Sequence, residues 1–290
     1  MKWWFAIVLF AYYYKALLCG LAAHTLGLVV VCEPLIWGIS VNHWIEIIVY
    51  CPLMWLALRQ VNVGVFGDTS LATTDSRPTT RGDVRRHKLI GEAAIAIYLY
   101  GTGIHITNVI EIYSREEEGV TSGDVYDLIY FLDEGLSHYL QFIPLFFVLG
   151  WFVMHDRPGR TGSPTLALLF GVGHGVERAI GIIEGGKWFL GPPTVVWLTM
   201  CVVLRMCRRG PEARDEFFVR YAITFCVTLP LAQVAYWLRF GSFDQPSNLG
   251  ASALAEMAVG GIILTATGGL VVLAIQRVRI RRARVAPKEA

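Results

Sequence analysis

Long apolar runs recur along the chain, and they limit the folds that the sequence can adopt. Of the 290 residues, 54% are hydrophobic and only 17% are charged, whereas a soluble domain carries about 25% charged residues. A helix that crosses the hydrocarbon core of a bilayer needs roughly 20 mostly apolar residues. The sequence therefore predicts an all-α, polytopic bundle of transmembrane helices and excludes an ordinary soluble domain.

We expect about eight spanning helices, or seven if the first two segments are misjudged. The apolar segments lie near residues 4–31, 42–59, 89–113, 126–154, 164–186, 192–207, 215–240 and 250–276. The polar stretch between Gln60 and His87 is predicted to be a loop. On this division, residues 1–276 form a single transmembrane domain and residues 277–290 form a basic tail.

The basic residues alternate between the two predicted sides of the membrane. Cytoplasmic loops collect Lys and Arg, and with the N-terminus inside, the cytoplasmic connections hold most of the 25 basic residues. We therefore expect both termini in the cytoplasm and the protein in the cell membrane. His87 and His155 lie in these basic flanks, and we expect them to face water. The net charge of only +2 excludes a strongly basic nucleic-acid binder.

Polar residues within the apolar segments carry the functional information. An Asp, Lys or Arg at mid-span costs about 2.5–3.5 kcal/mol, so such residues usually face the bundle interior. Three consecutive segments carry ionisable or amide side chains at helical spacing, namely His105 and Asn108, then Asp133, Glu134 and His138, then His174, Glu177, Arg178 and Glu184. Counted from the outer ends at about 1.5 Å per residue, most of these residues reach one level in the outer half of the membrane or near its midplane.

Imidazole and carboxylate side chains are ligands of zinc and non-haem iron. We therefore predict a zinc or iron site on the extracytoplasmic side. In this hypothesis His105, Glu134, His138 and His174 bind the metal, and Glu177 and Asp133 serve in catalysis. Asn108, Arg178 and Glu184 would orient the ligands. The alternative for each residue is a hydrogen-bonded network that joins helices.

The predicted function is hydrolysis or transfer on a lipid-like substrate, which could enter the site sideways from the bilayer. Membrane lipid is the expected partner, and no nucleic acid is expected. A proton-coupled transporter could use the same buried groups, and a haem- or di-iron-binding oxidoreductase could use the same histidines. The layout resembles the membrane hydrolases of the alkaline ceramidase and progestin-receptor group in architecture alone. No H-x-x-x-H motif occurs in the chain, so we assign it to no family from sequence.

Overall fold

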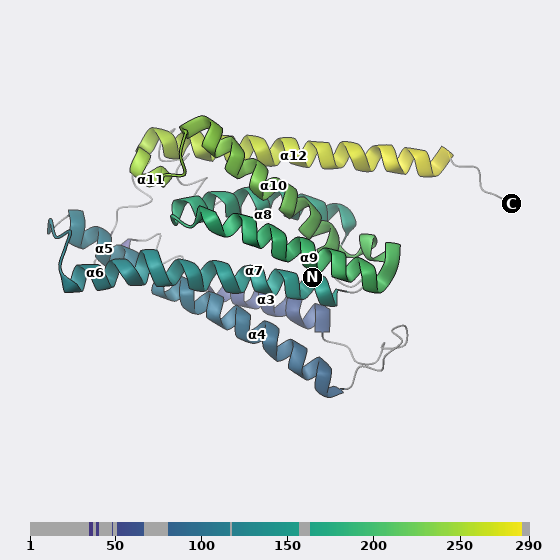
Figure 1. Ribbon diagram of the computed structural model, residues 1–290, viewed down its shortest axis with the longest axis horizontal. Coiled ribbons are helices and arrows are strands. Elements are labelled where there is room, and N and C mark those ends of the chain that lie inside the picture. The colour runs from purple at the N-terminus through teal and green to yellow at the C-terminus, as the bar shows by residue number, and fades with distance from the viewer. Residues whose placement is uncertain are drawn as a thin grey trace.

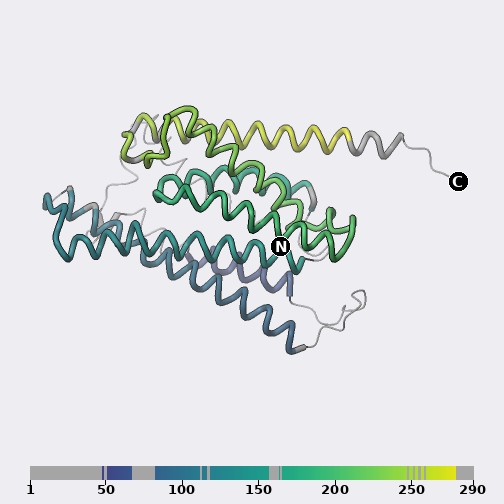
Figure 2. The backbone as a smooth tube through the Cα atoms, in the orientation of Figure 1, coloured from purple at the N-terminus to yellow at the C-terminus, as the bar shows by residue number. Residues whose placement is uncertain are grey.

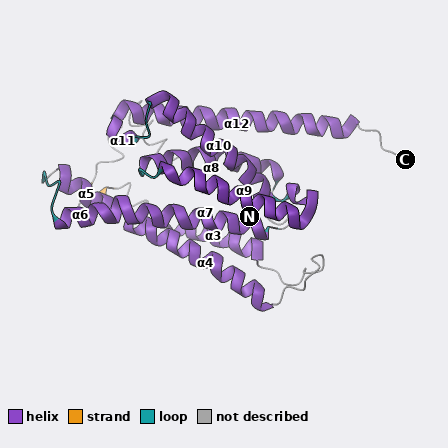
Figure 3. Ribbon diagram, viewed as in Figure 1, coloured by secondary structure: helices purple, strands orange, loops and turns teal. Residues whose placement is uncertain are grey.

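The computed structural model describes residues 35–36, 39–40, 48, 51–66, 81–116, 118–156 and 163–285. The predicted first segment, 4–31, lies outside these residues. Apart from the short hairpin of β1 (Leu35–Ile36) and β2 (Ile39–Ser40), the elements of the described chain are helices. Figure 3 shows this helical architecture, as the sequence predicts.

The helices follow the predicted apolar segments closely. They are α3 (Cys51–Phe66), α4 (Arg81–Ile104), α5 (Thr107–Glu116), α6 (Asp124–Tyr130), η4 (Phe131–Ser137), α7 (His138–His155), α8 (Pro164–Glu184), η5 (Trp188–Leu190), α9 (Gly191–Arg209), η6 (Gly210–Asp215), α10 (Phe217–Phe240), α11 (Pro246–Leu249) and α12 (Ala251–Val285). Among them, η4 is a π-helix, and η5 and η6 are 3₁₀ helices.

Six stretches of the described chain are long and apolar enough to cross a membrane. They are Gly82–Arg115, Asp124–His155, Thr165–Glu184, Trp188–Asp215, Phe217–Phe240 and Val259–Val278. The protein is therefore an integral, multi-pass membrane protein. The predicted segment 42–59 contributes α3, which has 16 residues and is not one of the six stretches.

The predicted loop between Gln60 and His87 is too long at both ends. Helix α3 continues to Phe66, and α4 begins at Arg81. The buried Asn62 side chain donates from Nδ2 to the carbonyl of Lys88 at 3.0 Å. Polar residues that suggest a loop are thus buried between two packed helices, and a sequence window cannot see that contact.

His87 and His155 also differ from the prediction, because they lie half-buried against aromatic side chains. Their ring centroids are 4.5 Å apart, and both rings contact Trp151. The His155 Nδ1 atom lies 2.8 Å from the carbonyl of Trp151, and the Trp151 indole donates to the carbonyl of His87 at 3.2 Å. The basic flank at the start of α4 is therefore packed onto the end of α7.

The helices pack in a sequence of neighbours across the bundle (Figures 1 and 2). Helix α3 contacts α4, α4 contacts α7, and α7 contacts α9. The most extensive helix pair is α8 with α10, and α12 packs mainly on α8. Figure 1 shows α12 along the edge of the bundle opposite α4. The core lies between α4, α7, α8, α9 and α10, with Tyr98, Leu145, Phe152, Leu198 and Phe225 among its fully buried side chains.

Small residues allow α8 and α10 to approach closely. A Cβ added to Gly171 would collide with the Thr224 hydroxyl, and one added to Gly175 would collide with the Thr228 hydroxyl. The Thr228 hydroxyl donates to the carbonyl of Gly171 at 3.1 Å. Glycine at these helix interfaces brings the two backbones together, as is common where lipid supplies no hydrophobic drive between helices.

A buried ionic network closes the bundle at the end where α7 finishes and α10 begins. Arg205 on α9 donates to both carboxylate oxygens of Glu216, at 2.7 and 2.8 Å, and to the carbonyls of Met154 and Asp156. The carboxylate of Asp156 accepts from the Phe218 amide at 2.7 Å, which satisfies an amide in the first turn of α10. Three helices are thereby joined at one end, here called the network end.

Candidate functional site

Two irregular helix segments meet at the opposite end of the bundle. Residues His105 and Ile106 separate α4 from α5, and the amides of Ile106 and Asn108 bond to carbonyls three residues earlier. The neighbouring segment η4 is a seven-residue π-helix. Single turns of 3₁₀ and π geometry inside long helices often mark functional positions. Here both irregular segments carry residues that the sequence predicts for the site.

Gly101 explains why these two segments lie so close together. A Cβ at Gly101 would lie 2.7 Å from the backbone carbon of Leu140 and 2.8 Å from the amide nitrogen of Gln141. The backbones of α4 and α7 therefore touch one turn before His105. Because side chains of neighbouring turns share a helix face, the contact directs His105 toward Asp133 and His138.

We call the group formed by His105, Asn108, Asp133, Glu134 and His138 the histidine–aspartate cluster. The Nδ1 atom of His105 lies 2.6 Å from Oδ1 of Asp133, and the Asn108 amide donates to Oδ2 of Asp133 at 2.8 Å. The Asp133 side chain is fully buried, whereas the His105 side chain is 28% exposed. A buried carboxylate thus holds an imidazole that a ligand can reach.

His138 lies beside this pair with its own ring orientation fixed. The ring centroids of His105 and His138 are 5.1 Å apart. The Nδ1 atom of His138 lies 3.1 Å from the carbonyl oxygen of Glu134. A carbonyl can only accept a hydrogen bond, so Nδ1 of His138 carries the proton and Nε2 is the basic nitrogen. The same tautomer follows for His105 when its neighbour is an ionised carboxylate.

Residues from the far part of the chain complete the cluster. The Gln245 amide donates to the Glu134 carboxylate at 3.2 Å and to the carbonyl of Glu184 at 2.7 Å. Gly185 lies directly against the His138 ring, since a Cβ there would be 3.0 Å from the ring. Sequence reasoning missed Gln245, because it follows α10 in a short loop and shares no helical spacing with the other residues.

Three further predicted residues, His174, Glu177 and Arg178, form a second group with Tyr221, which sequence reasoning missed; we call it the arginine–glutamate cluster. Arg178 donates from two nitrogens to the two Glu177 oxygens, each at 2.5 Å. His174 is hydrogen-bonded through Nδ1 to the Tyr221 hydroxyl, and its Nε2 atom lies 4.0 Å from Glu177. All four side chains are buried in the bundle core.

The structure does not bring the four predicted metal ligands into one shell. His138 contacts Gly185 at the end of α8, whereas His174 comes 11 residues earlier, which is roughly 16 Å along a helix axis. The Phe142 ring lies between the clusters, stacked on His138 at 5.7 Å and 5.7 Å from the Arg178 guanidinium. Within the described ranges, no group of three His, Cys, Asp or Glu residues is placed to hold a metal ion.

The predicted helical spacing is confirmed, but spacing alone does not predict how deep each residue lies along the bundle. Glu134 and His138 share a face, and so do His174 and Glu177. Their alignment across different helices depends on where each helix sits along the bundle. Glu184 contacts the site through its backbone, because its carbonyl accepts a hydrogen bond from the Gln245 side chain.

Comparison with known proteins adds no family to these observations. No family model matches the chain, and no curated protein or solved structure matches it. The functional argument therefore rests on the site itself.

Proposed function

We propose that the protein is a membrane-embedded enzyme, a hydrolase or transferase that acts on a lipid-like substrate at the histidine–aspartate cluster. The observation that carries this proposal is the contact between the buried Asp133 carboxylate and Nδ1 of the partly exposed His105. A carboxylate that orients an imidazole is a recurring arrangement for general-base catalysis, because it fixes the tautomer and stabilises the imidazolium that forms.

In the proposed reaction, His105 acts as the general base. Its Nε2 atom takes the proton of a water or lipid hydroxyl as that oxygen attacks an ester carbon or phosphorus atom. Asp133 stays ionised and offsets the positive charge of the imidazolium. The His105 imidazolium then gives this proton to the departing oxygen, while the basic Nε2 atom of His138, whose ring lies 5.1 Å away, accepts a hydrogen bond from the attacking water or hydroxyl. Glu134 beside His138 supplies negative charge.

In a second version of this proposal, the same cluster binds a zinc or iron ion. Metal-bound histidines usually donate their other ring nitrogen to a carboxylate or carbonyl, and both His105 and His138 have such a partner. His105, His138 and Glu134 would then be the protein ligands, without His174. The described residues gather no group of three such ligands, so the geometry favours the acid–base version. Glu177, paired with Arg178, takes no part in either.

The site lies near the ends of its helices, where a lipid headgroup can reach it. Two of the stretches that can cross a membrane contain its residues, Gly82–Arg115 and Asp124–His155. The distribution of basic residues supports placing the cluster on the extracytoplasmic side of the cell membrane.

A proton-coupled transporter is the second candidate, and the arginine–glutamate cluster favours it. Its four polar side chains are buried in the bundle core, and the Phe142 ring contacts both Arg178 of this cluster and His138. Buried groups of this kind form proton relays in transporters. If the protein is a transporter, Glu177→Gln should abolish transport as fully as changes at Asp133. If it is an enzyme, Glu177→Gln should mainly lower the stability of the fold.

The test compares Asp133→Asn with Glu92→Gln, an equivalent carboxylate-to-amide change in the exposed pair with Lys88. Each protein is incubated in nanodiscs with a total membrane lipid extract, and the products are followed by mass spectrometry. We expect the Asp133 variant to lose at least about a hundredfold in rate, because its amide favours the wrong imidazole tautomer. Equal turnover by the two variants, or no lipid product with the unaltered protein, would contradict the proposal.

The same preparations separate the metal and haem versions. Elemental analysis and an absorption spectrum are taken before and after chelation. Activity without bound metal supports acid–base chemistry. Stoichiometric zinc or iron that is lost in a His138→Ala variant supports the metal version, and a visible haem band supports neither.

A further inference from the structure

A cavity between α8, α10 and α12 lies outside both polar clusters. Its volume is about 560 Å³, within the range of pockets that hold small ligands. Its floor is buried and apolar, and includes Val176 and Ile183 of α8. The α12 side of the cavity is open, since Val259 and Ile263 are 42% and 58% exposed. The cavity is therefore a groove with a closed floor and an accessible rim.

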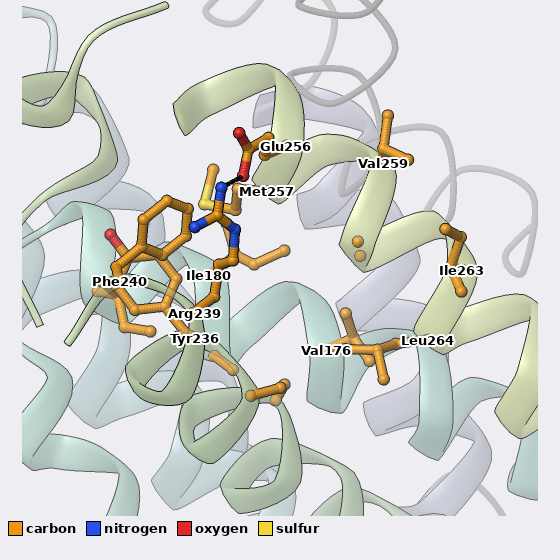
Figure 4. A pocket seen from close by; sticks show the side chains of 16 residues that line it. Val176, Ile180, Tyr236, Arg239, Phe240, Glu256, Met257, Val259, Ile263 and Leu264 are labelled. Carbon is orange, nitrogen blue, oxygen red and sulfur yellow. Dashed lines mark ion pairs between the residues drawn. The ribbon is translucent and has the colours of Figure 1, made fainter. Parts of the chain in front are cut away.

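Among the described residues that line this groove, Arg239 and Glu256 form the only ion pair. Their side chains meet at 2.5 Å at one end of it, while Val259, Ile263 and Leu264 line the rest of the α12 wall (Figure 4). Both side chains are largely exposed, at 63% and 47%. An exposed pair of this kind is weakly held, so another anion can replace Glu256 on the guanidinium.

The groove lies between helices that can cross a membrane, so lipid surrounds it. It is bounded by Thr165–Glu184, Phe217–Phe240 and Val259–Val278, three stretches that can cross a membrane. Only 11% of the α12 window is buried within the protein. Arg239 is the penultimate residue of its stretch, at the level of lipid headgroups, and the apolar walls extend from there into the span. A long apolar slot with a cation at its interfacial end matches one acyl chain and the phosphate of a phospholipid.

We propose that this groove is a binding site for an anionic phospholipid, with one acyl chain between α10 and α12 and the headgroup phosphate on Arg239. Arginine binds phosphate oxygens through two parallel N–H groups. The apolar walls enclose the acyl chain, so the bound lipid exchanges more slowly with the lipids around the protein. The site is independent of the proposed reaction at the histidine–aspartate cluster, and either assignment can fail without the other.

Gly260 offers a direct way to fill the groove. It lines the cavity, and a Cβ built on it meets no atom within 4 Å. A side chain added at this position therefore begins in open space, and Gly260→Leu tests whether filling the groove expels the acyl chain. Gly64 on α3 has the same open surroundings and is not part of the cavity lining, so Gly64→Leu is the matched control.

The experiment uses the full chain in nanodiscs with phosphatidylglycerol or phosphatidylcholine that carries a diazirine on one acyl chain. Labelled residues are identified by mass spectrometry. We expect phosphatidylglycerol to label residues 257–264 more strongly than Leu270 and Leu273, which are exposed on the same helix beyond the groove. Gly260→Leu should reduce labelling in the groove about tenfold or more, with Leu270 unchanged, and Gly64→Leu should leave both unchanged.

Arg239→Gln tests the headgroup contact. A single basic side chain near anionic lipid favours it by about fivefold, so we expect the preference for phosphatidylglycerol over phosphatidylcholine to fall by about that factor. Labelling of residues 257–264 no stronger than that of Leu270, or unaffected by Gly260→Leu, would overturn the site. A lipid preference that survives in Arg239→Gln would overturn the headgroup assignment.

Discussion

At the scale of single residues, Gly185 allows the His138 ring to pack directly against its Cα atom. An added methyl group would lie 3.0–3.1 Å from three ring atoms of His138. The backbone φ of Gly185 is −76°, which any residue adopts. The requirement for glycine is therefore the space that the imidazole needs.

We predict that Gly185→Ala displaces His138 and lowers activity at least about tenfold, since small misplacements of reacting groups are costly. Gly181→Ala is the control one turn earlier, where the nearest atom to the new methyl group is 3.7 Å away. Turnover of lipid products and the thermal unfolding midpoint are measured for both. Similar losses in the two variants would show that His138 needs no fixed position.

Sequence alone identified all five residues of the histidine–aspartate cluster but not their pairing. His105, Asn108, Asp133 and His138 were recognised because polar side chains recur where apolar ones are expected. Asp133 faces His105 because η4 has π geometry. No residue in Phe131–Ser137 predicts that geometry from sequence. The placement of His174 in a separate group depends on the relative heights of α7 and α8, which are set by tertiary packing.

At the scale of helices, six of the eight predicted apolar segments correspond to the stretches of the described chain that can span a membrane. The predicted segment 164–186 corresponds to α8 (Pro164–Glu184). Ser163 caps its N-terminus, because the Ser163 hydroxyl accepts from the Leu166 amide. The predicted segment 215–240 corresponds to α10, which ends where Gly241 adopts a left-handed conformation. The breaks at His105 and in η4 were not predicted, because both lie inside apolar patterns without proline.

The α8–α10 interface gives a prediction for helix packing. Gly171→Ala places a methyl group against the Thr224 hydroxyl and the Tyr221 carbonyl, so the two helices must separate. We expect a loss of about 1–3 kcal/mol in unfolding free energy, typical of overpacking. Gly64→Ala, with open space around it, should cost nothing. Unfolding in detergent monitored by circular dichroism measures both, and equal midpoints would contradict the close approach.

At the scale of the whole molecule, the Arg205 network joins α7, α9 and α10 at the network end. Arg205→Met leaves the buried Glu216 carboxylate without its partner, so we expect a loss of about 3–5 kcal/mol in unfolding free energy. Arg220→Met is the control at the same end, because its partner Asp215 is 73% exposed and stays solvated when the arginine is lost, so we expect a cost of about 0–1 kcal/mol. A double Arg205→Met, Glu216→Met variant should recover part of the loss.

The orientation of the molecule in the membrane is a further prediction at this scale. With the termini in the cytoplasm, the exposed connection at Ser122 faces outward and the exposed η6 residue Glu212 faces inward. In a background without the six native cysteines, Ser122→Cys should react with an impermeant maleimide in intact cells. Glu212→Cys should react only after permeabilisation, and the reverse pattern would place the histidine–aspartate cluster in the cytoplasmic half.

The π-helix η4 marks where the gene can lose one codon without misaligning the histidine–aspartate cluster. Loss of one codon there, such as that of Leu136, would let the chain return to a regular α-helix and keep the facing of everything upstream, because the wider π turn is what absorbs the extra residue. The same loss from the regular part of α7 would turn everything upstream by about 100° relative to the rest of the helix and point Asp133 away from His105. Mutational scans that only substitute residues would miss this dependence, whereas one-codon deletions would reveal it.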